Sequence, residues 1–111
     1  SVPRKVKRKA LKSILAIRFQ KGRVTLVDQL AVDPPSTKEL ARILKKLKIA
    51  GGTLIITPRL DRSLHLSARN IPGVTAAGIR DLNTYLVVSH RNIVITTEAL
   101  GHLQAWMEKI K

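Results

Sequence analysis

The sequence predicts a single α/β domain with an open, mostly parallel sheet of about four strands and helices on both faces. Strand-like and helix-like segments alternate along the chain with short connections, the order in which crossovers join parallel strands. One apolar run, Leu54 to Ile56, has the unbroken character of a strand buried on both sides. Because 44% of the 111 residues are hydrophobic, the chain can also form a substantial core. The expected topology is Rossmann-like.

Apolar residues at helical spacing predict an amphipathic helix from about Pro3 to Lys21. Proline suits the first turn, where the backbone N–H has no intrahelical partner, and Gly22 can end the helix. We interpret residues 1–22 as a basic amphipathic helix that enters the domain, and residues 23–111 as the remainder of the same globular domain. The residues expected on the core side of the helix are Val6, Ala10, Leu11, Ile14, Leu15 and Ile17.

The opposite side of this helix is strongly basic. The chain carries 21 Lys plus Arg and 7 Asp plus Glu, a formal charge of +14, and residues 1–23 hold nine of the basic residues and no acid. Such a charge points to a polyanionic partner and favours contact with nucleic-acid phosphates. A solvated surface or an acidic protein partner is the alternative. The ridge consists of Lys5, Arg8, Lys9 and Lys12, joined by Arg4 and Lys7.

A second basic face is predicted on the next helix. After a strand at 23–29, Ser36 and Glu39 have the spacing of a capping box that opens a helix reaching about Lys48. The apolar stripe of this helix is Leu40, Ile43, Leu44 and Leu47, and its opposite face carries Lys38, Arg42 and Lys45.

The remaining elements continue the alternation of strands and helices. Asp61 can cap a short helix, and Pro72 with Gly73 ends that unit before a weak strand. Trp106 is interpreted as a packing residue because it lies beside Leu103 on the last helix. The predicted segments are a strand at 53–57, a helix at 61–68, a strand at 74–77, a helix at 82–88, a strand at 93–96 and a helix at 97–111.

Several classes of site are excluded. The absence of Cys rules out a disulfide framework, a thiolate zinc site and a cysteine nucleophile. No glycine-rich phosphate loop follows a strand, and His65, His90 and His102 lack metal-ligand spacing. Three aromatic residues are too few for a domain that stacks bases on several side chains, which favours contact with phosphates. We therefore expect no catalytic residue, no metal and no cofactor.

Short motifs in a fixed order identify a family resemblance. They are PRKVKRKALKSIL at 3–15, VTLVDQL at 24–30, STKELARILKKL at 36–47, SARNIPGV at 67–74, LNTY at 82–85 and IVITTEAL at 93–100. Each motif is weak alone, but together they span nearly the whole chain. The chain resembles the large-subunit ribosomal protein four family of bacteria and organelles.

The resemblance implies a structural constituent of the large ribosomal subunit that binds large-subunit rRNA, supports subunit assembly and has no enzymatic activity. It implies neighbouring ribosomal proteins as further partners, with no membrane and no small-molecule substrate. The expected location is the ribosome of a bacterial cytoplasm, a plastid or a mitochondrion. The alternative is a regulatory RNA- or DNA-binding protein that acts off the ribosome, such as in feedback on its own messenger. The residues expected to bind rRNA are Arg4, Lys5, Lys7, Arg8, Lys9, Lys12, Lys38, Arg42 and Lys45.

The chain departs from the family pattern at several places. The family's amino-terminal half, including a basic loop that reaches the peptide exit tunnel, has no counterpart here, so the chain resembles a carboxyl-terminal portion or a natural fragment, and the tunnel role of the family cannot be assigned to these residues. Leu86 stands where the family often has an acidic residue, and Pro58-Arg59-Leu60 replaces a commonly acidic stretch. Both changes make the surface less negative. Arg69 and Asn70 match an Ala-Arg-Asn run of the family; we expect them to anchor a helix end first and to contact RNA second.

Overall fold

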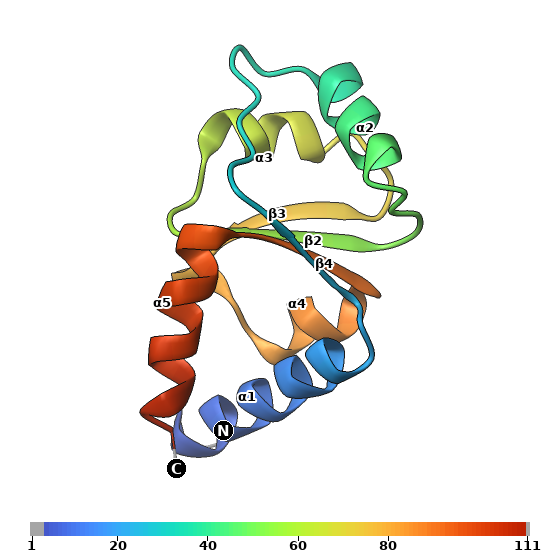
Figure 1. Cartoon of the computed structure of the whole chain (residues 1–111). Coiled ribbons are helices and arrows are strands. Elements are labelled where there is room, and N and C mark those ends of the chain that lie inside the picture. The colour runs from blue at the N-terminus through green and yellow to red at the C-terminus, as the bar shows by residue number, and fades with distance from the viewer. Residues whose placement is uncertain (1–3, 111) are drawn as a thin grey trace.

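The computed structural model describes the backbone of residues 4–110 and the side chains of residues 7–110. One sheet contains the strands β1 (Val24–Val27), β2 (Thr53–Thr57), β3 (Val74–Gly78) and β4 (Asn92–Thr96). The strand order is β1-β4-β2-β3 and every pairing is parallel, which confirms the predicted open parallel sheet (Figure 1). Pro3 and Lys111, predicted as the first and last helical residues, lie outside the described residues.

Helices cover both faces of the sheet. They are α1 (Arg4–Gln20), α2 (Thr37–Lys46), α3 (Arg62–Ala68), α4 (Thr84–Ser89) and α5 (Thr97–Glu108), and the short 3-10 helix η1 (Ile79–Asp81) leads from β3 towards α4. One hydrophobic core joins α1, α4 and α5 to the sheet, and a second joins α2 and α3 to the opposite face (Figure 1). This two-sided arrangement is the predicted α/β architecture.

The central strand β2 supplies side chains to both cores. All five of its residues are buried. Leu54 and Ile56 pack with α1, α4 and α5, while Ile55 packs with α2 and α3. Successive side chains of a strand point to opposite faces, so a strand between two helical layers needs an apolar residue at nearly every position. The interpretation of this run as a doubly buried strand is confirmed.

The cap of α2 is half of the predicted capping box. The Ser36 hydroxyl accepts a hydrogen bond from the backbone N–H of Glu39 at 3.1 Å, as expected. The reciprocal bond is replaced, because the Ser36 N–H donates to the hydroxyl of Ser67 on α3 at 2.8 Å. The Glu39 carboxylate instead accepts hydrogen bonds from Arg42. A tertiary contact between α2 and α3 therefore takes over one half of a local motif.

Helix α1 packs through a narrower stripe than the sequence predicted. Leu11 and Leu15, one turn apart, are 7% and 0% exposed and belong to the core. Ala10 is exposed and Ile17 is 41% exposed, so their predicted place on the core side is wrong. Both lie more than about 90° around the helix from the line of Leu11 and Leu15, beyond the reach of the sheet. The side chain of Val6 lies outside the described residues.

Several helices and strands begin or end at other residues than the sequence predicted. Helix α4 begins at Thr84 rather than at 82, because the side-chain amide oxygen of Asn83 accepts a hydrogen bond from the backbone N–H of Leu86 at 2.9 Å. Helix α5 ends at Glu108 rather than at 111. Strand β1 spans 24–27 rather than 23–29. Helix α3 begins after Asp61, whose carboxylate accepts the N–H of Leu64 at 3.1 Å, as predicted.

We predict that Leu44→Ala lowers the free energy of unfolding by about 2 to 5 kcal/mol, because it removes a buried side chain from the core under α2. Urea denaturation measures the change. Leu60→Ala is the matched control, since Leu60 is 54% exposed and the loss there should stay within about 0.5 kcal/mol. Equal losses in the two variants would contradict the assigned core.

Candidate nucleic-acid interface

The amino-terminal part of α1 presents a row of exposed cations, which we call the α1 face: Lys7, Arg8 and Lys9. Leu11 and Leu15 are anchored in the core and fix the rotation of the helix, so Lys9 points away from the sheet. Lys7 and Arg8 precede Leu11 on the same side of the helix and are exposed there. The first turn of the helix contains no acidic residue that would neutralise them. The side chains of Arg4 and Lys5, also predicted here, lie outside the described residues. Exposed cations of this kind are suited to contacts with phosphates.

Lys12 has a structural role that its sequence position did not indicate. It is half-buried, and its Nζ donates a hydrogen bond to the backbone carbonyl of Ile110 at 2.6 Å. Ile110 lies two residues beyond the end of α5, so its carbonyl has no intrahelical partner, and a positive charge near the carboxyl end of a helix is favourable. Lys12 therefore ties α1 to the end of α5 and is less available to a ligand than its exposed neighbours.

Helix α2 carries the second predicted group, which we call the α2 face: Lys38, Arg42 and Lys45. All three are exposed. Arg42 is paired with Glu39 one turn away, with Nε donating to Oε2 at 3.2 Å. The Arg42 hydrogen bond, followed by its charge, lowers the pKa of the Glu39 carboxyl, and Glu39 in turn raises the pKa of Arg42. Among the side chains of residues 7–110, the α2 face therefore presents two cations without an acidic partner and one whose charge is shared.

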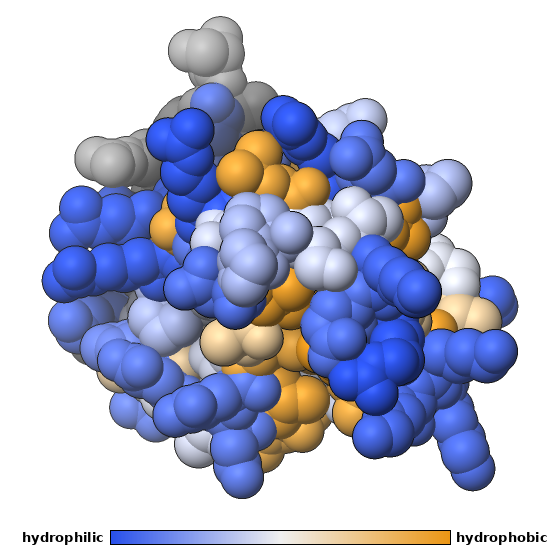
Figure 2. Space-filling model, turned by 90° about the horizontal axis from the view of Figure 1, so that it is seen from above, coloured by the Kyte–Doolittle hydropathy of each residue, from blue (hydrophilic) through white to orange (hydrophobic). Residues whose placement is uncertain are grey.

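The two basic faces lie on opposite sides of the sheet. Helix α1 belongs to the layer with α4 and α5, and α2 to the layer with α3 (Figure 1). Viewed from above, onto the α2 and α3 side, hydrophilic side chains surround a seam of hydrophobic ones (Figure 2). A single flat polyanion cannot cover both faces. The predicted residues thus form two separate surface groups.

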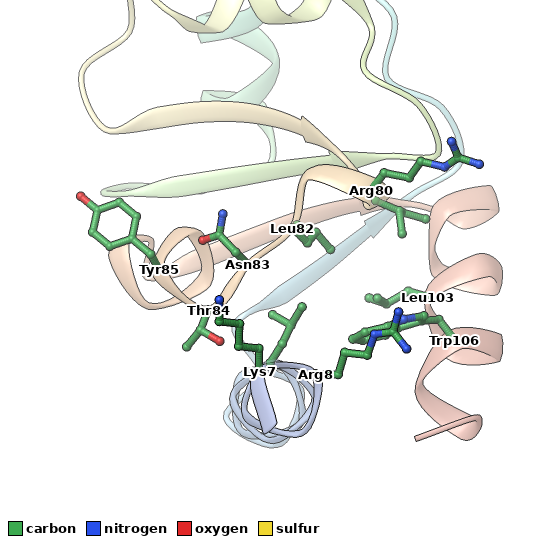
Figure 3. A pocket seen from close by; sticks show the side chains of 11 residues that line it. Lys7, Arg8, Arg80, Leu82, Asn83, Thr84, Tyr85, Leu103 and Trp106 are labelled. Carbon is green, nitrogen blue, oxygen red and sulfur yellow. The ribbon is translucent and has the colours of Figure 1, made fainter. Parts of the chain in front are cut away.

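A groove that the sequence did not reveal lies beside the α1 face. It has a volume of about 1010 Å³ and is walled by α1, by the segment from η1 to α4, and by α5 (Figure 3). Lys7 and Arg8 of the α1 face line it together with Arg80 of η1, and no acidic side chain is among its lining residues. Tyr85 and Trp106 line it as well. Two of the three aromatic residues of the chain therefore line the same groove as three cationic side chains.

Trp106 has two roles. It is half-buried and packs against the core with α5, which confirms its interpretation as a packing residue. It also lines the groove, where Figure 3 shows the Arg8 side chain extending in its direction. Arg80 and Asn83 were missed because no periodic pattern marks them. The LNTY motif at 82–85 was the one local signal for this region.

The edge where doubly wound sheets commonly bind ligands is acidic in this molecule. A hollow at the carboxyl ends of the strands is lined by Asp28, Asp61 and Glu98 together with Arg59. Carboxylates repel phosphate groups, so this edge is unsuited to a nucleotide. It lies away from the α1 face and the groove, whose lining residues it does not share.

The histidines do not form a common site. His90 is buried, with Nδ1 at 2.6 Å from the Leu86 carbonyl and Nε2 at 2.9 Å from the Thr75 hydroxyl. His65 and His102 are exposed on separate helices. Within residues 4–110, no three His, Cys, Asp or Glu side chains are grouped so that they could hold a metal ion. No helix in the same range is both long enough and apolar enough to span a membrane.

Comparison with known proteins gives one consistent result. Residues 1–106 match the family model described as "Ribosomal protein L4/L1 family". The chain is 43% identical over 103 residues to the large ribosomal subunit protein uL4 of Desulforudis audaxviator, covering 93% of this chain and 50% of that protein. It is 39% identical over 104 residues to uL4 of Heliobacterium modesticaldum, covering 94% and 50%, and 41% identical over 100 residues to uL4 of Carboxydothermus hydrogenoformans, covering 90% and 48%. The chain thus spans about half the length of these relatives, in agreement with the shortened sequence that the resemblance implied.

We predict that Arg42→Ala returns the pKa of Glu39 towards the ordinary value of a glutamate. A lowered pKa in the folded state contributes stability that is present above the unfolded pKa and is lost as pH falls through the folded pKa. The variant should therefore lose less stability on acidification. An NMR titration of the Glu39 carboxyl carbon measures the pKa, and Lys38→Ala, which leaves the pair intact, is the control. An unaltered Glu39 titration in Arg42→Ala would show that the pair does not form in solution.

Proposed function

Because this chain belongs to the ribosomal protein L4/L1 family, we propose that it is a structural component of the large ribosomal subunit that binds large-subunit rRNA and supports subunit assembly. The observation that carries the rRNA-binding role is the α1 face, a row of exposed cations on a helix whose first turn has no acid. The relatives named above are large-subunit proteins, and the family description names a ribosomal protein rather than an enzyme.

The proposed mechanism is electrostatic docking of a preformed α/β body onto folded RNA. Lys7 and Lys9 supply compact charges, and the planar guanidinium of Arg8 can contact two phosphate oxygens at once. Arg4 and Lys5 extend the same row in the sequence. Helical RNA has a deep, narrow major groove that side chains read poorly, so recognition of the three-dimensional shape of the RNA provides the specificity. The core that holds Leu11 and Leu15 keeps the cations in register before binding.

The α2 face is proposed as a second, weaker rRNA contact. Lys38 and Lys45 offer charge on the far side of the sheet, while Arg42 shares its charge with Glu39. Two faces on opposite sides fit a protein enclosed between RNA segments rather than one resting on a single surface. Neighbouring ribosomal proteins are the further partners, and the acidic edge at Asp28, Asp61 and Glu98 is a surface of the opposite sign for them.

The proposed location is a bacterial-type ribosome. The relatives named above are all bacterial, which favours a bacterial cytoplasm over a plastid or a mitochondrion. Sedimentation distinguishes this role from regulation off the ribosome. Co-migration with large subunits through a moderate-salt wash supports the structural role, whereas a free pool bound to one messenger would support feedback control.

We predict that replacing Lys7, Arg8 and Lys9 together by Ala weakens binding to large-subunit rRNA and flattens its salt dependence. Each lost phosphate contact should reduce the slope of log K against log salt by about 0.7 to 0.9. Filter binding over a series of salt concentrations measures the slope. Lys12 is left in place because its hydrogen bond to Ile110 would complicate the result.

The matched variant replaces Lys38, Arg42 and Lys45 by Ala, which removes the same formal charge from the other face. In this variant the slope of log K against log salt should be reduced by less than in the variant of Lys7, Arg8 and Lys9, because Arg42 is already paired with Glu39. Slopes that stay at the wild-type value in both variants would refute the proposed interface. A larger loss from the α2 variant would reverse the assigned order of the two faces.

A further inference from the structure

The groove beside the α1 face combines side chains that phosphate contact alone does not require. Its three cations come from two elements that are distant in the sequence, Lys7 and Arg8 on α1 and Arg80 on η1. Tyr85 belongs to the same lining and is 77% exposed. An exposed aromatic ring at the edge of a basic groove offers its face to a ligand.

The walls of the groove are held by contacts that exist without any ligand. Leu11 and Leu103, which form part of the floor, are 7% and 1% exposed and belong to the core. Lys12 ties α1 to the end of α5 through the Ile110 carbonyl. Asn83 caps α4 with its side-chain amide oxygen, Oδ1, and this cap fixes the start of the helix that carries Tyr85. The site is therefore largely preformed, which lowers the entropic cost of binding.

The polar groups of the groove select the chemistry of its occupant. Because Asn83 uses its carbonyl oxygen in the cap, it offers a ligand the N–H donors of its amide. Figure 3 shows Tyr85 at the end of the groove away from α5, and Arg8 and Trp106 towards α5. The exposed ring of Tyr85 can stack on a flat, unsaturated group, and the surrounding cations can hold anions. Unpaired nucleotides carry both, whereas paired nucleotides hide their faces in the helix stack.

We propose that this groove holds a short unpaired segment of large-subunit rRNA, a bulge or a loop, with one base stacked on Tyr85 and its flanking phosphates contacted by Lys7, Arg8 and Arg80. The inference rests on the proposed function and deepens it, because Lys7 and Arg8 belong to both the α1 face and the groove. The α1 face meets the RNA backbone, and the adjoining groove takes the base that projects from it. An acidic protein segment would match the cations but would leave the tyrosine ring without a stacking partner.

The experiment compares Tyr85→Ala, Tyr85→Phe and Val88→Ala in filter binding to a transcript of bacterial large-subunit rRNA at several salt concentrations. Val88 is the matched control, since it lies on the same helix, is 55% exposed and is not among the residues that line the groove. Tyr85→Ala should weaken binding about five- to a hundredfold, the range measured for loss of one stacked base. Tyr85→Phe and Val88→Ala should stay within about twofold of wild type, because the former keeps the ring.

The salt dependence separates stacking from charge. Tyrosine is uncharged, so Tyr85→Ala should lower the affinity at every salt concentration and leave the slope unchanged, whereas Arg80→Ala should reduce the slope by about 0.7 to 0.9. Thermal melting verifies that the variants are folded. Crosslinking of a 4-thiouridine-substituted transcript should additionally yield a peptide that contains Tyr85.

Each other outcome overturns a distinct claim. Failure of the wild-type chain to bind the transcript would refute the proposed function itself. Tight wild-type binding with an unaffected Tyr85→Ala would refute only the groove inference and leave the α1 face standing. Equal losses in Tyr85→Ala and Tyr85→Phe would show that the hydroxyl, not the ring, matters. If Arg80→Ala weakens binding of a polyglutamate peptide but not of the transcript, the groove takes an acidic protein segment instead.

Discussion

The absence of a solvent-exposed face on β2 governs the rest of the molecule. All five residues of that strand are buried, so helices must cover both sides of the sheet. The chain meets this requirement with α1, α4 and α5 on one face and α2 and α3 on the other. Each covering helix then has an outward side that the core does not use. On α1 and α2 that side is basic, and a packing constraint thereby decides where the charge of the protein is presented.

The distribution of charge follows from this layering. A chain with a formal charge of +14 repels itself, and placing the α1 and α2 faces on opposite sides of the sheet separates two of its basic groups. At physiological ionic strength the field of exposed charges decays over about 8 Å, so the two faces act on ligands independently. Three of the seven acidic residues lie at the carboxyl edge of the strands, and a fourth, Glu39, is paired with Arg42. None of these four carboxylates lines the groove.

Local patterns in the sequence predicted most of the fold because most of its helices and strands have a clear apolar period. The run at 53–57, the Ser36 cap and the stripe through Leu40 and Leu44 all carried their structural meaning within a few residues. Patterns of this kind fail where the deciding contact is distant in the sequence. The Lys12 bond to Ile110 spans 98 positions, and the Ser36 N–H is diverted to Ser67 across 31. The exposure of Ile17 likewise depends on how wide a strip of α1 the sheet can cover, which periodicity does not report.

The groove is the clearest case of a feature that local sequence patterns do not predict, since its walls come from the beginning, the later part and the end of the chain. Its position depends on the turn that leads from β3 into η1. A Cβ at Gly78 would lie 2.7 Å from the backbone nitrogen of Leu60, so only glycine lets the end of β3 approach the loop after β2 this closely. That approach sets where the chain leaves the sheet for η1, which carries Arg80. The basic helix that composition and periodicity reveal is one wall of a site, and the sheet supplies the others by bringing remote segments to fixed positions beside it.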